Sequence, residues 1–285
     1  MTLIDGKSIS AKVKDEIKSA ASDLAAKGVE PALAVILVGE DAASKTYVAS
    51  KEKACAACRI RSVAHRLSSD VSEAALLELI KNLNEDESID GILVQLPLPK
   101  HIDTNKILEK ISPQKDVDGF SAINVGKLTS GLADGFVPCT PLGVMRLLEE
   151  YGVQIAGKNA VVLGRSNIVG KPMASLLLNA DATVTIAHSK TKNLKRLCAD
   201  ADILVAAIGR AHFVSTDMVK EGAVVIDVGI NRGEDGKLRG DVDFDAVAPK
   251  CSFITPVPGG VGPMTIAMLL SNTIKSAKNR LRQRA

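Results

Sequence analysis

Short apolar segments alternate with helical ones along this chain, and that alternation constrains its fold more than any other feature. Residues 31–38 (PALAVILV) and 92–96 (ILVQL) have the continuous apolar character of buried strands, and residues 60–67 are a weaker strand candidate. The segments with the composition or apolar spacing of helices are 8–27, 41–57 and 72–83. Helices that alternate with buried strands predict an α/β fold with a mostly parallel sheet.

A second α/β series follows a hinge predicted around residues 119–141. Thr140 and Pro141 predict a helix start, with Thr140 as the N-cap and Pro141 at the first helical position. The strands predicted after that helix are 159–163, 182–187, 202–207 and 223–227. The last helical pattern, residues 263–282, is expected to pack back on the first half. The predicted domains are residues 1–139 with the returning helix 264–285, and residues 140–263.

The composition argues against several classes of function. The 285 residues include no Trp and only 2% aromatic side chains, which leaves little for base stacking and counts against a nucleic-acid partner. The net charge of +3 is small, although it suits an anionic substrate or cofactor. The N-terminus lacks the pattern of a secretory signal, and no apolar stretch reaches the ~20 residues that span a bilayer. We expect a soluble, cytoplasmic protein without a membrane partner.

The cysteines indicate neither disulfides nor a metal site. The chain has five, an odd number, spread over its length. Cys55 and Cys58 have C-x-x-C spacing, but no second Cys or His pair accompanies them to complete a zinc site. We interpret them as small apolar residues of a helix and expect no metal.

The second half carries the pattern of a dinucleotide-binding turn. Apolar residues 160–163 lead into Gly164, and after a short loop Gly170 begins a segment rich in Ala and Leu. A glycine at the strand end lets a pyrophosphate approach the backbone, and the helix N-terminus offers unpaired N–H groups. Ser166 stands where the standard G-x-G-x-x-G pattern has a glycine, so a plain turn is the alternative interpretation.

Residues at the end of the next predicted strand favour NADP over NAD. NAD-selective sites place an acidic residue there, whereas this chain has Ser189 and Lys190. Arg165, directly after the glycine of the first turn, is expected on the same rim of the sheet. These side chains suit a 2′-phosphate, because each charge-assisted hydrogen bond contributes about 1.5–3 kcal/mol. The alternative is that Lys190 and Lys192 are solvated surface charges.

Two glycine-rich turns complete the second half. Residues 228–231 follow the strand that ends at Asp227, and residues 256–265 (PVPGGVGPMT) lead into the last helix. A turn so dense in glycine lets the backbone approach a nicotinamide or a substrate. A purely structural turn is the alternative.

Polar side chains in the first half are candidates for the chemistry. Ser44, Tyr47 and Lys51 are spaced i, i+3 and i+7 and therefore share one face of the predicted helix. Gln95 interrupts an apolar strand near its end, which directs its amide into a cleft, and Asp118 lies in a predicted loop. Taken singly, the same residues also fit a surface pattern, an edge strand and a turn.

Motifs along nearly the whole chain follow one another in the order of a known family. They are Val38-Gly39, Ala43-Ser44, Tyr47-Val48, Lys51, GILVQLPLP at 91–99, Pro113, KDVDG at 115–119, PCTP at 138–141, Gly164-Arg165-Ser166, IVG at 168–170 and residues 256–265. They resemble the signatures of the bifunctional methylenetetrahydrofolate dehydrogenase/methenyltetrahydrofolate cyclohydrolase family, with no departure at the positions that matter.

The resemblance implies an enzyme of one-carbon metabolism that acts on tetrahydrofolate derivatives. Such an enzyme oxidises 5,10-methylenetetrahydrofolate with NADP and hydrolyses the methenyl product to 10-formyltetrahydrofolate. The first predicted domain would bind folate and carry the catalytic residues, and the second would be a Rossmann-type NADP-binding domain. A homodimer built through the cofactor domains is also implied.

The resemblance further implies a role for each candidate residue. Lys51 would be the main catalytic residue, held by Gln95, while Tyr47 would stack on the aminobenzoate ring and Asp118 would hydrogen-bond the pterin. Further substrate contacts would come from Ser44, Pro258 and Gly259. Cofactor contacts would come from Gly164, Arg165, Ser166, Ser189, Ile230 and Thr140. We hypothesise that burial and the positively charged substrate lower the pKa of Lys51, so that a neutral amine accepts the proton of the attacking water.

Two other functions stay open on sequence alone. One is a monofunctional dehydrogenase, and the other is a non-catalytic NADP-binding protein on the same fold. The presence of Lys51 and Gln95 argues against the first, and the full set with Tyr47 and Asp118 argues against the second.

The chain is also rich in basic residues towards its C-terminus. They are Lys275, Lys278, Arg280, Arg282 and Arg284. A solvated helix end is the expected explanation for all of them.

Overall fold

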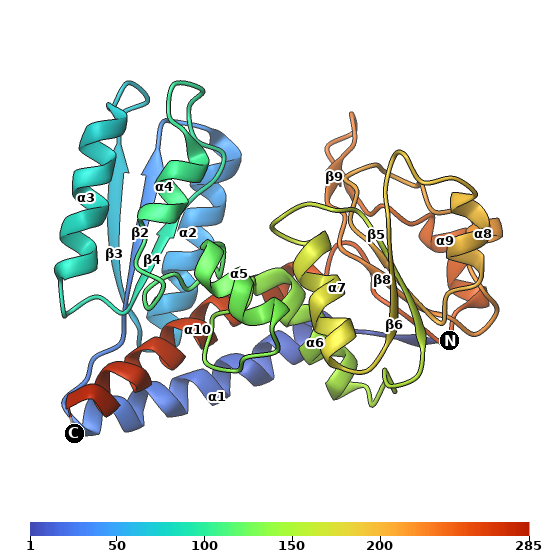
Figure 1. The fold of residues 1–285 in the computed structure, drawn as a ribbon, viewed down its shortest axis with the longest axis horizontal. Helices are drawn as coiled ribbons and strands as arrows, with labels where there is room; N and C mark the ends of the chain where they lie inside the picture. The colour runs from blue at the N-terminus through green and yellow to red at the C-terminus, as the bar shows by residue number, and fades with distance from the viewer. Residues whose placement is uncertain (285) are drawn as a thin grey trace. The chain divides into compact units, whose positions relative to one another are not determined.

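The computed structural model describes residues 1–284, which divide into two compact units (Figure 1). The large-sheet unit comprises residues 1–11 and 140–265, and the small-sheet unit comprises residues 12–139 and the chain from Ile266 onward. The division falls within the first and last helices, so each unit draws on both ends of the chain. The predicted α/β fold is confirmed.

The elements alternate in type through most of the chain. The helices are α1 (Gly6–Ala26), α2 (Ala42–Ala57), α3 (Glu73–Glu85), α4 (Thr104–Lys110), α5 (Ala122–Thr129), α6 (Cys139–Glu150), α7 (Gly170–Asn179), α8 (Leu194–Ala199), α9 (Phe244–Val247) and α10 (Val261–Arg284). The strands are β1 (Thr2–Leu3), β2 (Ala32–Val38), β3 (Arg61–Leu67), β4 (Gly91–Val94), β5 (Asn159–Leu163), β6 (Thr183–Ala187), β7 (Ile203–Ala206), β8 (Val224–Asp227), β9 (Asn231–Arg232), β10 (Leu238–Arg239) and β11 (Phe253–Ile254).

The small-sheet unit is built on a parallel sheet with the order β3-β2-β4. Every residue of the central strand β2 is buried, as expected for a strand covered on both faces. Helices α2, α3 and α4 flank the sheet (Figure 1). Its core includes Ile36, Ile80, Ile92 and Ile107. This arrangement brings the carboxyl ends of β2 and β4 to one edge, next to α2.

The large-sheet unit contains a parallel sheet with the order β1-β11-β8-β7-β5-β6. Leu163 at the end of β5 pairs with Ala187 at the end of β6 and with Ala206 at the end of β7. The turns that follow these strands therefore gather at one edge, where open α/β sheets bind ligands. A short antiparallel hairpin of β9 and β10 follows β8.

The long strands and helices lie where the sequence predicts them, and the predicted hinge at residues 119–141 contains the boundary between the two units at residues 139 and 140, but it is not a plain linker. That segment contains α5, whose N-cap Ser121 accepts a hydrogen bond from the amide of Asn124 at 3.3 Å. Asn124 is buried and donates to the carbonyl of Pro113 at 3.0 Å. Strand β4 also ends at Val94, two residues earlier than predicted. Helix α4 was not predicted.

The predicted cap of α6 is also wrong. The helix begins at Cys139, which places Thr140 inside its first turn and not at the N-cap. The Thr140 hydroxyl lies 2.9 Å from the hydroxyl of Thr265. A partner near the start of α10 thus replaces the expected bond to the backbone of α6.

The last helix returns to the first part of the chain, as predicted. The side-chain amide of Asn272 donates to the carbonyl of Val117 at 2.8 Å, and the hydroxyl of Ser276 donates to the carbonyl of Gln114 at 2.9 Å. These bonds attach α10 to the loop that follows β4 and α4.

The expectation of a solvated basic end is wrong for Arg280 and Lys275. Arg280 forms a two-pronged ion pair with Asp90, with Nε–Oδ1 at 2.7 Å and Nη2–Oδ2 at 3.0 Å. Lys275 donates to the carbonyls of Ala133 and Gly135. The remaining basic residues differ: Lys278 and Arg282 are exposed, and the side chain of Arg284 lies outside the part that the structure describes.

We predict that Arg280→Ala lowers the free energy of unfolding by about 3–5 kcal/mol, because it leaves a buried carboxylate without its partner. The Asp90 side chain is only 1% exposed. Urea unfolding followed by circular dichroism measures the change, and Lys278→Ala, an exposed position on the same helix, is the control, expected within about 0.5 kcal/mol of wild type. Equal stability of the two variants would contradict the role of the ion pair.

Candidate active site

Lys51 and Gln95 meet at the carboxyl edge of the small sheet. The Nζ atom of Lys51, on α2, donates to Oε1 of Gln95 at 2.9 Å. Gln95 directly follows β4, and its Nε2 donates to the carbonyl of Leu96 at 2.8 Å. Because the amide nitrogen is occupied in this way, the amide oxygen is held towards the lysine. The structure thus brings together two residues that lie far apart in the sequence.

Tyr47 and Ser44 lie on α2 but differ in exposure. The Tyr47 ring is 49% exposed, one turn before Lys51, so it offers a flat apolar surface. Ser44 is buried, and its amide and hydroxyl both bond the carboxylate of Asp41, the N-cap of the helix. Ser44 therefore stabilises the start of α2 in this structure, and its contact with substrate stays a prediction.

Asp118 lies in the same unit as Lys51 and interacts with it electrostatically. Its carboxyl keeps some exposed surface, yet the groups packed around it desolvate it and raise its pKa, while the positive charge of Lys51 acts in the opposite direction. The buried thiol of Cys139 donates to Oδ1 of Asp118 at 3.4 Å. Desolvation, with Asp118 as a second cause, raises the pKa of Cys139 well above its ordinary value, so the thiol stays a donor at neutral pH.

A second aspartate, which the sequence did not single out, fixes the loop that carries Asp118. The carboxylate of buried Asp116 accepts from the amides of Phe120 and Ser121, at 3.2 and 2.8 Å, and from the side chain of Asn124 at 2.9 Å. The only sequence signal for this role is that Asp116 and Asp118 occur together in KDVDG.

In the large-sheet unit, Gly164 and Gly170 form a tightly packed turn between β5 and α7. Gly164 has φ +127°, and a Cβ atom there would overlap the carbonyl oxygen of Ala207. A Cβ atom on Gly170 would overlap the carbonyl of Gly164 itself. Both glycines are therefore required by close packing, whatever binds at the turn.

The loop between these glycines is exposed, and so is the turn after β6. Arg165 and Ser166 are exposed, and Ser166 Oγ accepts from the amides of Val169 and Gly170 at 3.1 and 3.3 Å. Ser189 and Lys190 are exposed after β6, the strand next to β5. Two cationic side chains thus follow neighbouring strand ends, an arrangement that fits a phosphate group.

The turn after β8 carries Ile230 and contacts two buried aspartates, Asp227 and Asp241. Ile230 is 46% exposed and packs near Gly262, where a Cβ atom would lie 3.6 Å from Ile230 Cδ1. Desolvation raises the pKa of Asp227 to about 6, with the charge of Asp241 also raising it and backbone N–H groups lowering it. Sequence reasoning assigned no role to either aspartate.

The glycine-rich turn at residues 256–265 receives the start of α1. The amide of Lys7 donates to the carbonyl of Gly259 at 3.1 Å, and a Cβ atom on Gly6 would overlap the carbonyl of Gly260. Gly259 is buried with φ +109°, whereas Pro258 is exposed. Close packing against the start of α1 therefore accounts for the glycines of this turn. A ligand contact at Pro258 or Gly259 stays a prediction.

The cysteines and a separate hollow show no further chemistry. All five cysteines are free and buried, and desolvation raises the pKa of Cys55 to about 12, which makes it a poor metal ligand. Within residues 1–284, no group of three or more Cys, His, Asp or Glu side chains is arranged for a metal ion.

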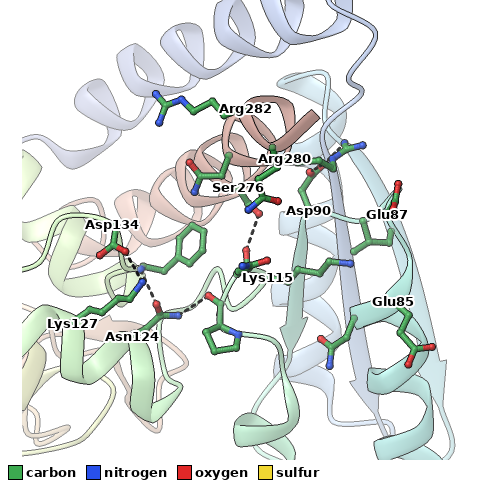
Figure 2. Close-up of a pocket in the computed structure, with 17 residues that line it drawn as sticks. Glu85, Glu87, Asp90, Lys115, Asn124, Lys127, Asp134, Ser276, Arg280 and Arg282 are labelled. Atoms are coloured by element: carbon green, nitrogen blue, oxygen red, sulfur yellow. Dashed lines mark hydrogen bonds and ion pairs between the residues drawn. The ribbon is translucent and has the colours of Figure 1, made fainter. Parts of the chain in front are cut away.

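A separate hollow has a volume of about 670 Å³ and is lined by none of the predicted site residues (Figure 2). In it Lys127 pairs with Asp134, with Nζ–Oδ2 at 2.7 Å. We assign no ligand to it.

Two family models match the chain. Residues 4–118 match the catalytic domain of the tetrahydrofolate dehydrogenase/cyclohydrolase family, and residues 138–281 match its NAD(P)-binding domain. A protein of Campylobacter hominis named bifunctional protein FolD is 71% identical over 283 residues, which cover 99% of each chain.

Solved structures agree as well. The bifunctional FolD methylenetetrahydrofolate dehydrogenase/cyclohydrolase of Campylobacter jejuni is 58% identical, with a TM-score of 0.97 over 98% of this chain and 99% of that one. The Trypanosoma brucei methylenetetrahydrofolate dehydrogenase-cyclohydrolase, solved with NADP and an inhibitor, is 42% identical, with a TM-score of 0.94 over 100% and 99%. The resemblance inferred from the motifs is confirmed, and the chain belongs to the tetrahydrofolate dehydrogenase/cyclohydrolase family.

Proposed function

We propose that this chain is a bifunctional enzyme of folate one-carbon metabolism. It oxidises 5,10-methylenetetrahydrofolate with NADP to the methenyl form and hydrolyses that product to 10-formyltetrahydrofolate. Family membership over both domains and relatives named as bifunctional support this function. The observation that carries it is the 2.9 Å bond between Lys51 and Gln95, in the unit that also holds the carboxyl of Asp118.

The large-sheet unit fits the cofactor. Gly164 leaves no side chain at the end of β5, and exposed Arg165, Ser189 and Lys190 follow the ends of β5 and β6. When bound, NADP supplies the hydride acceptor. Arg165 and Lys190 would hold the 2′-phosphate by charge-assisted hydrogen bonds. The residues to which we assign cofactor contacts are Gly164, Arg165, Ser166, Ser189, Ile230 and Thr140.

Lys51 would act in the hydrolytic step. Loss of hydride leaves a methenyl cation, whose electrophilic carbon is attacked by water. The amine of Lys51, in its neutral form, would accept a proton from that water. Gln95 would aim the amine, because its oxygen accepts from Nζ while its nitrogen is held by Leu96.

The remaining residues of the small-sheet unit would position the folate. The exposed ring of Tyr47 would stack on the aminobenzoate group, and the Asp118 carboxylate would accept hydrogen bonds from the pterin amino group. Ser44, Pro258 and Gly259 stay predicted substrate contacts. In this proposal folate chemistry belongs to residues 1–139 with helix 264–285, and cofactor binding to residues 140–263.

We also propose that the enzyme is a homodimer, formed through the large-sheet unit. Strand β6 is an edge of the large sheet, so within residues 1–284 one side of its backbone has no neighbouring strand. Ile186 on β6 is 39% exposed, and Leu178 on α7, which packs against β6, is 60% exposed. An unpaired edge beside exposed apolar side chains suits self-association across a twofold axis.

A cytoplasmic location is a further part of the proposal. All five cysteines are free and buried, as is usual for proteins of a reducing compartment. Separately, none of the helices within residues 1–284 is both long and apolar enough to cross a membrane.

Lys51→Met is expected to reduce cyclohydrolase turnover by about 10²-fold or more, because it removes the proton acceptor. Hydrolysis of methenyltetrahydrofolate, followed by loss of its absorbance, measures the effect. Lys53→Met is the matched control, because Lys53 is an exposed residue on the same helix, and it should retain turnover within about twofold. Near-normal hydrolysis by the Lys51 variant would contradict the assignment.

Arg165→Ala is expected to raise the KM for NADP by about tenfold or more, because it removes a charge-assisted bond to the 2′-phosphate. The KM for NAD should change little, since NAD lacks that phosphate. Initial rates of cofactor reduction by methylenetetrahydrofolate measure both. The control is Arg196→Ala, an exposed arginine on α8 whose guanidinium lies 3.8 Å from Asp200. Equal losses for the two cofactors would rule out 2′-phosphate recognition by Arg165.

The dimer is tested by a double variant, Leu178→Glu with Ile186→Glu. We expect it to shift the molar mass in light scattering from dimer to monomer, because charge is buried in the proposed interface. Leu132→Glu, at an equally apolar position that is 56% exposed in the small-sheet unit, should stay dimeric. A monomeric wild-type protein would refute the proposal.

A further inference from the structure

Two turns at the carboxyl edge of the large sheet, those after β7 and β8, lie on one side of the proposed cofactor turn after β5. After β7, the carbonyl oxygen of Ala207 lies so close to Gly164 that a Cβ atom on that glycine would overlap it. The amide of Ala207 also donates to the carbonyl of Leu163 at 2.8 Å. After β8, the turn at Gly229 and Ile230 presents the exposed Ile230 side chain. The position of the glycine turn therefore depends on the turn after β7.

The buried carboxylate of Asp241 holds both the turn after β7 and the turn after β8. Oδ2 of Asp241 accepts from the amides of Ile208 and Gly209, at 2.7 and 3.0 Å. Its Oδ1 accepts from the amide of Arg210 at 2.7 Å and from the side chain of Asn231 at 3.0 Å. The first three donors belong to the turn after β7, and Asn231 belongs to the segment after β8. Asp241 is 0% exposed, so it contacts no solvent.

A second buried carboxylate supports the first. Oδ1 of Asp227, at the end of β8, accepts from the amides of Gly229 and Asp241, at 3.0 and 2.9 Å, and its Oδ2 accepts from the amide of Val242 at 2.9 Å. A Cβ atom on Gly240 would overlap Asp227 Oδ2, and one on Gly229 would overlap Asp241 Oδ1. The two aspartates thus connect the ends of β7 and β8 through direct hydrogen bonds.

We propose that Asp241, supported by Asp227, is a positioning residue for the dinucleotide site, an inference that rests on the proposed function. By accepting four hydrogen bonds it fixes the turns after β7 and β8 relative to each other, so that the Gly164 turn and Ile230 are held in one arrangement before the cofactor binds. Such preorganisation increases affinity, because less ordering is needed on binding. Asp241 acts only through these turns, since it has no exposed surface.

Asp241→Asn tests the proposal. Asn keeps the shape of the side chain but replaces one acceptor oxygen by an NH₂ group that faces backbone donors. We expect the Kd for NADPH, measured by isothermal titration calorimetry, to rise about tenfold or more. Hydrolysis of methenyltetrahydrofolate, assayed without cofactor, should stay within about twofold of wild type. Asn231→Ala removes a single donor and should raise the Kd by about threefold or more, and it decides the test if Asp241→Asn does not fold.

The matched control is Asp116→Asn in the small-sheet unit. Asp116 is also buried and accepts from two backbone amides and one Asn side chain, where Asp241 accepts from three amides and one Asn side chain, so the chemical change is of the same kind. The opposite split is expected: a KM for methenyltetrahydrofolate raised about tenfold or more, with NADPH affinity kept. NADPH affinity within about twofold of wild type in Asp241→Asn, or in Asn231→Ala if the Asp241 variant does not fold, would overturn the proposal, as would equal loss of NADPH binding and hydrolysis in the Asp241 variant. Wild-type protein that reduces NADP with methylenetetrahydrofolate and hydrolyses methenyltetrahydrofolate establishes the proposed function independently of these variants.

Discussion

Buried carboxylates that accept backbone N–H groups hold the loops of both units. A loop at the end of a parallel sheet has amides without ladder partners, and an amide removed from water needs an acceptor. Asp116 provides that acceptor next to Asp118, and Asp227 and Asp241 provide it after β7 and β8. Because a buried carboxylate is costly unless all its partners are in place, each of them favours a single arrangement of its loop. The site residues carried by these loops are therefore also held in one arrangement.

The main elements could be predicted because parallel strands covered on both faces are continuously apolar. Strands β2 and β5 show this pattern and lie within a residue of their predicted bounds. Strands β1 and β11 have two residues each, too few to show any periodicity. Helix α5 has eight residues and contains a glycine, so its sequence carries only a weak helical signal. The first turn of α6 was misplaced because Thr140 has a partner in Thr265, which local capping rules do not consider.

The site was predictable only where its geometry is local or where the family motifs are specific. Helical spacing places Tyr47 and Lys51 on one face, but the contact between Lys51 and Gln95 depends on how α2 packs beside β4. Asp241 was missed because an aspartate in a turn looks the same in sequence whether it is solvated or buried. Arg280 was assigned to solvent for a similar reason, since its partner Asp90 lies 190 residues earlier.

The way the last helix is shared between the units has a consequence for biosynthesis. Asn272, Ser276 and Arg280 bond groups that lie 155, 162 and 190 residues earlier in the chain. The nascent small sheet therefore emerges from the ribosome well before the helix that secures its loops, and every strand of the large sheet except β1 is translated in between. Domains generally fold as units during synthesis. Here the loops of the small-sheet unit acquire their α10 anchors only after the strands β5 to β11 of the other unit have been translated.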